Sequence, residues 1–231
     1  MKILGINASP RNSNSQTLKL VMAVLNGAES KGAKTELWDI CKLNIEFCNA
    51  CRICHKTGRC LKRDDFQALY GKIMDAGGLV MGSPNYFRSV TAQMKTMIDR
   101  MAYAIHCQLL TDKYTVNVAT SGGIGHHKQV TDYLNEAMLN FGSFVTGSVG
   151  VSVRQGPKAF EEAKRRAFRL GEKLAEDIRY KKNYTGQRKI MKENRIYFQR
   201  LVRMHRHDWS HEFHYWNRIN RGEGAEMAAK Q

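Results

Sequence analysis

The chain has 231 residues, of which 42% are hydrophobic and 25% charged, a composition typical of a soluble globular protein with one domain and an appendage. No apolar run approaches the length of a membrane span, which argues against a membrane-spanning protein. The formal net charge is +16, with +7 from residue 181 onward and +9 before it, so no single basic segment accounts for it. An excess of positive charge indicates an acidic partner.

Residues 2–8 form a short apolar run that predicts a buried strand and does not resemble a secretory signal. A polar loop over residues 9–17 precedes a helical pattern, and such a loop at the carboxyl end of a parallel strand suits a phosphate. The alternative is an ordinary capped helix, because Ser and Asn are preferred caps whatever the loop binds. The loop offers hydroxyl, amide and guanidinium groups from Ser9, Arg11, Asn12, Ser13, Asn14, Ser15 and Thr17.

Residues 34–40 predict a second strand, and a cysteine-rich loop over residues 41–64 follows it. Tightly spaced thiolates can bind one centre, and sulfur ligands favour an iron–sulfur cluster or zinc. The spacing is compact for structural zinc, and unliganded or oxidised thiols are the third interpretation. Cys41 and Cys107 are expected to be buried apolar residues. The other four, at spacings of two, two and five residues, are Cys48, Cys51, Cys54 and Cys60.

Asp64 and Asp65 begin the next predicted helix, where their charges suit the positive N-terminus, and a catalytic carboxylate pair is the less favoured interpretation. A buried strand over residues 78–82 then leads to a turn. Its Pro84 stiffens the chain, Asn85 offers hydrogen bonds, and Tyr86 and Phe87 either lie against a flat ligand or complete the core. The helix predicted over residues 90–105 carries a methionine stripe that we expect to pack in the core.

A fourth strand, residues 114–119, leads to Thr120, Ser121, Gly122 and Gly123, where the glycines allow close approach of a ligand to the backbone. The neighbouring pair of histidines is assigned no catalytic role. A fifth strand, residues 144–153, and a helix over residues 157–180 complete an alternating pattern that predicts a parallel sheet. The loops after strands one, three and four then meet at one edge, and the flavodoxin-like order 2-1-3-4-5 places FMN there.

Several motifs together resemble the iron–sulfur flavoproteins of the NADPH-dependent FMN reductase superfamily. The resemblance covers residues 1–180 and implies a flavodoxin-like fold, FMN, a 4Fe-4S cluster on the four cysteines, and a homo-oligomer, dimer or tetramer, in which cluster and flavin of neighbouring subunits approach each other. The motifs are Ser9-Pro10-Arg11 with Asn14-Ser15, the cysteine stretch with Asp64-Asp65, Gly82-Ser83-Pro84-Asn85-Tyr86, and Lys95 with Asp99-Arg100.

The resemblance also implies roles for individual residues. The FMN phosphate would be bound by Ser9, Arg11, Asn14 and Ser15. The isoalloxazine ring would be contacted by Pro84, Asn85 and Tyr86, with residues 120–123. The four clustered cysteines would hold the 4Fe-4S cluster.

The chain is therefore expected to have a flavodoxin-like FMN-binding domain, residues 1–180, and a basic, helical, aromatic-rich extension, residues 181–231. The extension is too aromatic for a disordered tail, and we expect it to pack on the core or wrap a neighbouring subunit. Its interleaved histidines leave a metal or nucleic-acid patch as the alternative.

The expected function is an FMN-dependent oxidoreductase that passes electrons between a 4Fe-4S cluster and FMN, in a reducing cytoplasm. An acidic ferredoxin-like carrier or NAD(P)H would be the electron donor. One alternative is a cluster-free NAD(P)H-dependent FMN or quinone reductase. Another is a zinc or nucleic-acid binding module, although the chain has no recognition motif for nucleic acid, which makes that ligand unlikely on sequence grounds.

Overall fold

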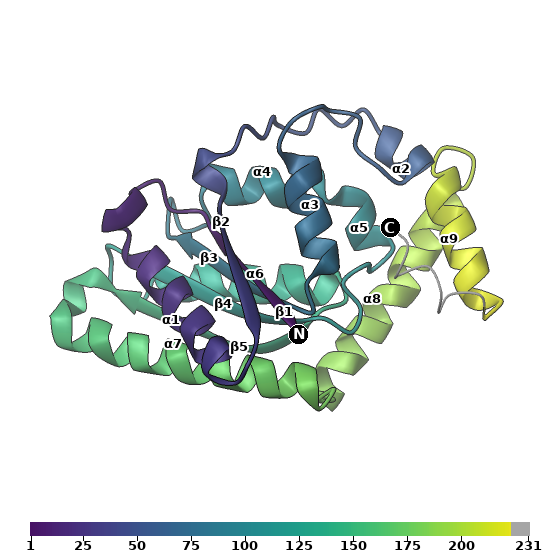
Figure 1. Cartoon of the computed structure of the whole chain (residues 1–231). Helices are drawn as coiled ribbons and strands as arrows, with labels where there is room; N and C mark the ends of the chain where they lie inside the picture. Colours follow the sequence, from purple (N-terminus) through teal and green to yellow (C-terminus); the bar gives the residue numbers. More distant parts are fainter. Residues whose placement is uncertain (223–231) are drawn as a thin grey trace.

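The computed structural model describes residues 1–222, and its centre is a five-stranded parallel sheet in the order β2-β1-β3-β4-β5 (Figure 1). This arrangement confirms the flavodoxin-like order that the sequence predicts. The strands are β1 (Lys2–Asn7), β2 (Lys34–Asp39), β3 (Gly78–Pro84), β4 (Tyr114–Ser121) and β5 (Phe144–Ser152). Residues 223–231 of the predicted extension lie outside the described residues.

Helices cover both faces of the sheet, because every central strand is apolar on both sides. Ile3 and Leu4 are both buried, yet Ile3 packs with α1 and α7 whereas Leu4 packs with α3, α4 and α6. The helices are α1 (Gln16–Ser30), α2 (Ile53–Thr57), α3 (Phe66–Asp75), α4 (Ala92–Arg100), α5 (Ala102–His106), α6 (His127–Asn140), α7 (Gly156–Arg179), α8 (Thr185–Met204) and α9 (Ser210–Asn220). Short 3-10 turns are η1 (Asn12–Asn14), η2 (Ile40–Lys42) and η3 (Val153–Gln155).

The methionine stripe packs in the core as predicted, with Met94, Met97 and Met101 all at most 2% exposed. The single helix predicted over residues 90–105 is wrong. At Met101 the last turn tightens to a hydrogen bond from its N–H to the carbonyl of Ile98 (3.0 Å), and the backbone of Met101, with φ −92° and ψ +20°, leaves the helical conformation between α4 and α5. Of the two cysteines predicted to be buried, Cys107 is buried but Cys41 lies partly exposed, because in η2 it is the neighbouring Ile40 that packs in the core.

The extension is helical and contacts the rest of the chain. On α8, the Gln187 side chain accepts a hydrogen bond from the N–H of Val145 and donates one to its carbonyl, both at 2.8 Å, so it satisfies a backbone edge of β5 that would otherwise be open. α9 lies beside α2 and α5, far from the N-terminal end of α1 (Figure 1). None of the helices within residues 1–222 combines the length and apolar character needed to cross a bilayer.

Candidate functional site

The loops after β1, β3 and β4 meet at the carboxyl edge of the sheet, as the parallel arrangement requires. Direct hydrogen bonds join them. The hydroxyls of Thr17 and Thr120 lie 2.6 Å apart, and the N–H of Asn85 donates to the carbonyl of Thr120 at 2.7 Å. The N–H of Ala8 donates to the carbonyl of Gly82 at 2.9 Å, which joins the first loop to β3. The three loops therefore form one surface.

The first loop ends at a helix N-terminus suited to an anion. The hydroxyl of Ser15 accepts a hydrogen bond from the N–H of Leu18 (3.0 Å) and so caps α1, whose first turn has no acidic residue. Ser9 is buried beside it, and Arg11 and Asn14 are exposed. The loop over residues 9–17 therefore caps α1 through Ser15, and its remaining polar groups are compatible with binding an anion.

The turn after β3 presents its aromatic residues to solvent. Tyr86 and Ser89 exchange two backbone hydrogen bonds of 2.9 and 3.0 Å, and the residues between them, Phe87 and Arg88, have φ angles of +50° and +62°. Two left-handed non-glycine residues cost roughly 1–2 kcal/mol each. Phe87 is fully exposed and Tyr86 is 46% exposed, so the interpretation of these rings as core residues is wrong.

The polar residues beside this turn are held in place. The amide Nδ2 of Asn85 donates to the carbonyl of His126 at 3.1 Å, and Pro84 is the last residue of β3. Thr120 and Ser121 belong to β4, which is two residues longer than predicted, and the Ser121 hydroxyl donates to the carbonyl of Gly123 at 2.5 Å. This glycine loop thus begins at the end of a regular strand.

The four clustered cysteines lie in an irregular segment between η2 and α3. Cys48 and Cys51 are exposed, whereas Cys54, on α2, and Cys60 are partly buried. Burial raises the pKa of Cys54 to about 11, and Cys60, Glu212, Cys48 and Cys51 contribute to the same shift in that order. Cys54 is therefore near enough to the other three cysteines to feel their charge, although among residues 1–222 the cysteine sulfurs are not drawn together into a closed metal-binding group.

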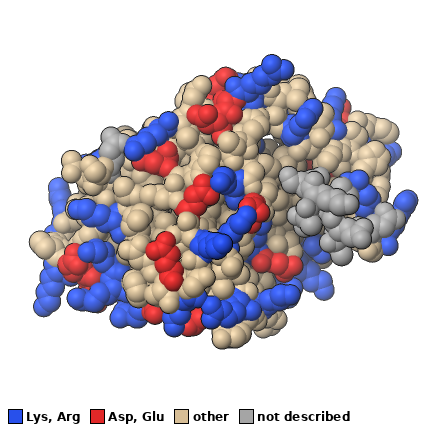
Figure 2. Space-filling view, viewed as in Figure 1, with Lys and Arg blue, Asp and Glu red and all other residues tan. Residues whose placement is uncertain are grey.

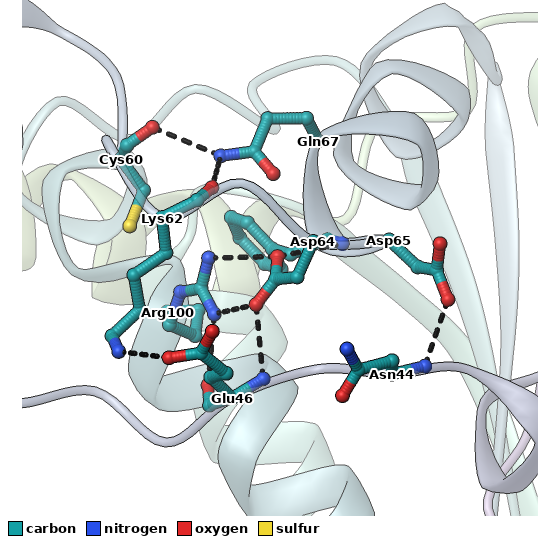
Figure 3. A network of polar contacts seen from close by, with 9 residues as sticks. Asn44, Glu46, Cys60, Lys62, Asp64, Asp65, Gln67 and Arg100 are labelled. Carbon is teal, nitrogen blue, oxygen red and sulfur yellow. Dashed lines mark hydrogen bonds and ion pairs between the residues drawn. The ribbon is translucent and has the colours of Figure 1, made fainter.

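A buried ion pair holds this segment against α4 (Figure 3). The guanidinium of Arg100 donates to both carboxylate oxygens of Asp64, at 2.7 and 3.1 Å, and to the carbonyl of Glu46 at 2.8 Å. Both side chains are at most 1% exposed, and the guanidinium also lies over the Phe66 ring, 4.6 Å from its centroid. Burial opposes the charged form of Arg100, but Asp64 and Cys60 favour it and raise its pKa overall.

The carboxylates of this network serve the backbone (Figure 3). Asp64 accepts hydrogen bonds from the N–H groups of Glu46 (2.9 Å) and Phe66 (3.1 Å), and Asp65 accepts one from Asn44 (2.8 Å). Gln67 donates to the carbonyl of Cys60 at 2.9 Å. The two aspartates, at the end of the cysteine-rich loop, therefore bind the backbone at its beginning and hold the two ends of the loop together. Both carboxylates are occupied in this structural role, so the geometry does not support the interpretation of them as a catalytic pair.

The fold defines the class of the protein as flavodoxin-like α/β, and solved structures with the same fold agree. A flavone reductase has a TM-score of 0.63 at 22% identity, over 78% of this chain and 63% of its own. The NAD(P)H:quinone oxidoreductase from Methanothermobacter marburgensis has a TM-score of 0.61 at 20% identity, over 75% of this chain and 96% of its own.

Sequence comparison identifies the family. Residues 1–158 match the family of the NADPH-dependent FMN reductases. An iron-sulfur flavoprotein of Archaeoglobus fulgidus is 34% identical over 177 residues, 76% of this chain and 80% of the relative. Another, of Methanocaldococcus jannaschii, is 37% identical over 100 residues, 43% of this chain and 51% of the relative. The chain belongs to the NADPH-dependent FMN reductase family, and it is a flavin-dependent oxidoreductase.

Proposed function

We propose that this chain is an iron–sulfur flavoprotein that passes electrons between FMN at the carboxyl edge of the sheet and a 4Fe-4S cluster on Cys48, Cys51, Cys54 and Cys60. The observation that carries the proposal is that the four cysteines share one short segment, residues 48–60, next to the buried pair of Arg100 and Asp64 that fixes it. The name of the Archaeoglobus fulgidus relative supports it.

The residues at the sheet edge fit FMN. A phosphate would accept hydrogen bonds from Ser9, Arg11, Asn14 and Ser15 at the positive end of α1. The buried Nδ2 of Asn7, at the end of β1, has no hydrogen-bond partner among the described residues, so a donor is available beside this loop. The isoalloxazine ring would be contacted by Pro84, Asn85, Tyr86, Phe87, Thr120, Ser121, Gly122 and Gly123.

The cysteine segment fits a cluster by its chemistry. Four thiols offer the complete ligand set of a 4Fe-4S cluster, and metal binding would release their protons. Ala50 and Arg52, which lie between the cysteines, have φ angles of +53° and +61°, so the chain curls there at a conformational cost. A strained backbone conformation persists only where contacts with the rest of the protein hold it. Arg100 holds one part of this segment, and a metal bound to the cysteines would hold the strained residues as well.

The chain's own residues would then set position and electrostatics. When bound, FMN exchanges two electrons with carriers such as NAD(P)H and single electrons with a cluster. Arg100 places a positive charge close to Cys60. The hydrogen bonds of Asn85 and Thr120 hold the ring-side loops together. We assign no residue as a general acid or base.

The surface charge supports an acidic electron-transfer partner. Lys and Arg are spread over the visible face with acidic side chains between them, and they do not form one basic patch (Figure 2). The net charge of +16 therefore attracts an acidic partner at long range and does not mark one binding surface. We infer an acidic ferredoxin-like donor, with NAD(P)H as the other candidate, and a homo-oligomer in the reducing cytoplasm. Reduction by such a carrier should slow as salt rises, and a salt-independent rate would contradict this assignment.

The test is to quantify iron, sulfide, zinc and FMN in protein purified without oxygen. We expect about four irons and one FMN per chain, from the ligand number of the cluster. The variant Cys54→Ser should lose most of the iron and keep the FMN, whereas the matched control Cys41→Ser, in η2 just before the segment, should keep both. FMN without iron would instead indicate a cluster-free NAD(P)H-dependent FMN or quinone reductase, and zinc without FMN would overturn the proposal.

A further inference from the structure

The last described helix, α9, is docked on the cysteine segment. The indole N–H of Trp216 donates to the carbonyl of His106 at 3.1 Å, and Trp216 is only 3% exposed. α8 carries the chain from the end of α7 to this position, so α9 lies next to α2 and α5 (Figure 1). The extension thus reaches the part of the molecule that bears Cys54.

Glu212 on α9 forms the polar centre of this contact. Its carboxylate is fully buried and bridges two rings: Nδ1 of His55 lies 2.5 Å from one oxygen, and Nδ1 of His106 lies 3.1 Å from the other. Because an ionised carboxylate can only accept, each ring donates from Nδ1. A buried carboxylate without partners would be costly, and each histidine would lose its acceptor if Glu212 were removed. Since His55 is the residue after Cys54, this bridge acts on the helix that holds a candidate ligand.

Ring packing supports the same docking. Trp209 stacks on His55, with centroids 4.7 Å apart, on His106 (4.8 Å) and on His205 (4.5 Å). At the other end of α2, Gly58 has a φ of +75°, and a Cβ there would overlap the ring of His211. α9 and Trp209, the residue before it, therefore contact α2 at His55 and at its C-terminal cap, Gly58.

α2 has little of its own to fix its position. It has five residues, too few for a helix to be stable alone, and its first turn has no side-chain cap. Within residues 1–222, the hydrogen bond from His55 to Glu212 is the one polar side-chain contact that α2 makes with another element. Its position therefore depends on α9 together with the stack of His55 on His106 of α5, whose ring centroids lie 5.2 Å apart.

We propose that α9 is a latch on the cysteine segment, and that Glu212 is a positioning residue that fixes α2, and with it Cys54, through His55. The proposal rests on the proposed function in taking Cys54 as a cluster ligand. Glu212, His55 and His106 have donor atoms within 4.8 Å of one another and could instead hold a metal ion. We favour the latch because each carboxylate oxygen already accepts a ring N–H.

The test compares Glu212→Ala with Glu193→Ala, which removes an exposed carboxylate from α8 of the same extension. In the full chain, freed of metal by a chelator under reducing conditions, the alkylation rate of each cysteine is measured by mass spectrometry. For Glu212→Ala, and for Glu212→Asp, which keeps the charge, we expect the rate at Cys54 to rise at least about fivefold by local opening, while Cys48, already exposed, changes less than about twofold. A rise in Glu212→Ala alone would reflect only the lost charge, which raises the pKa of Cys54, and would contradict the latch. Glu193→Ala should match the wild type. As purified, Glu212→Ala should lose iron and keep FMN.

Unchanged alkylation at Cys54 together with unchanged iron would overturn the latch. So would zinc that binds at about one ion per wild-type chain, is kept in Cys54→Ser and is lost in Glu212→Ala, because that result makes the three groups a metal site. If Glu212→Ala does not fold, Glu212→Asp keeps the charge but shortens the side chain, and faster alkylation of Cys54 in it supports the latch. A wild type without iron would overturn the proposed function alone, and the alkylation ratio would still decide the latch.

Discussion

The sheet edge and the cysteine segment are held in place in different ways. At the edge, the loops follow regular strands and are joined by short contacts such as the Thr17–Thr120 hydroxyl pair and the bond from Asn85 to Thr120. The cysteine segment has only the five-residue α2, and side chains distant in sequence, Arg100 and Glu212, hold it. The first region follows from the fold itself, whereas the second depends on a few buried charges that single substitutions can remove.

Removing Arg100 should give the largest loss of stability, because Arg100 holds the cysteine segment. Arg100→Met leaves Asp64 as a buried, unpaired carboxylate, and we expect a loss of about 3–5 kcal/mol in the free energy of unfolding. The measurement is denaturant unfolding, with iron content as the readout of the cysteine segment.

Lys95→Met is the matched control for Arg100→Met, because Lys95 pairs with Asp99 on the surface of the same helix and its loss should cost less than about 1 kcal/mol. The double variant Arg100→Met with Asp64→Leu should recover much of the loss, since no charge is then left unpaired. A loss in Arg100→Met no larger than that in the control would show that the buried pair does not hold the segment.

The pH dependence of stability tests the same ion pair through its acidic partner, Asp64. Hydrogen bonds from Arg100 and from backbone N–H groups lower the pKa of Asp64 although burial, the largest single influence, raises it. A carboxyl group with a lowered folded pKa stabilises the protein above its unfolded pKa of about 3.9, and this stabilisation is lost as the pH falls through the folded value. The difference in unfolding free energy between wild type and Asp64→Asn should therefore shrink between about pH 5 and pH 3.

Asp75 provides the comparison for this pH experiment. Its pKa is also lowered, first by the hydrogen bond from Lys2, but both side chains are more than 60% exposed. Salt at about 0.5 M should abolish the effect of Asp75→Asn and leave that of Asp64→Asn, because exposed pairs are screened and buried pairs are not. Equal loss of both effects in salt would contradict the buried character of the Asp64 pair.

The sequence predicts the sheet edge better than the cysteine segment for a physical reason. Apolar runs followed by polar or glycine-rich loops are local patterns, and the parallel sheet alone brings Ser15, Asn85 and Thr120 to one edge. The exposure of Phe87 could not be predicted, because an aromatic residue after a buried strand fits a core equally well.

The contacts of the cysteine segment join residues far apart in the chain. Asp64 lies 36 residues before Arg100, and His55 lies 157 residues before Glu212. A charged residue within a helical pattern normally indicates a solvated face, so neither Arg100 nor Glu212 carried a local signal of burial. The spacing of the cysteines is the one local pattern that points to this segment. It predicts the kind of group that the segment binds, but it does not predict that Arg100 and Glu212 fix the segment in place.

The smallest expected effect lies at the sheet edge. Thr17→Val removes one of two buried hydroxyls that lie 2.6 Å apart and keeps the shape of the side chain, so we expect a loss of about 1 kcal/mol in the free energy of unfolding. Thr17→Ser keeps the hydroxyl and is the control. Because the neighbouring loops retain their backbone hydrogen bonds, iron content and the alkylation rate of Cys54 should stay at wild-type values in Thr17→Val. A change at Cys54 would show that the edge and the cysteine segment are coupled, and would contradict the view that each region is held by its own contacts.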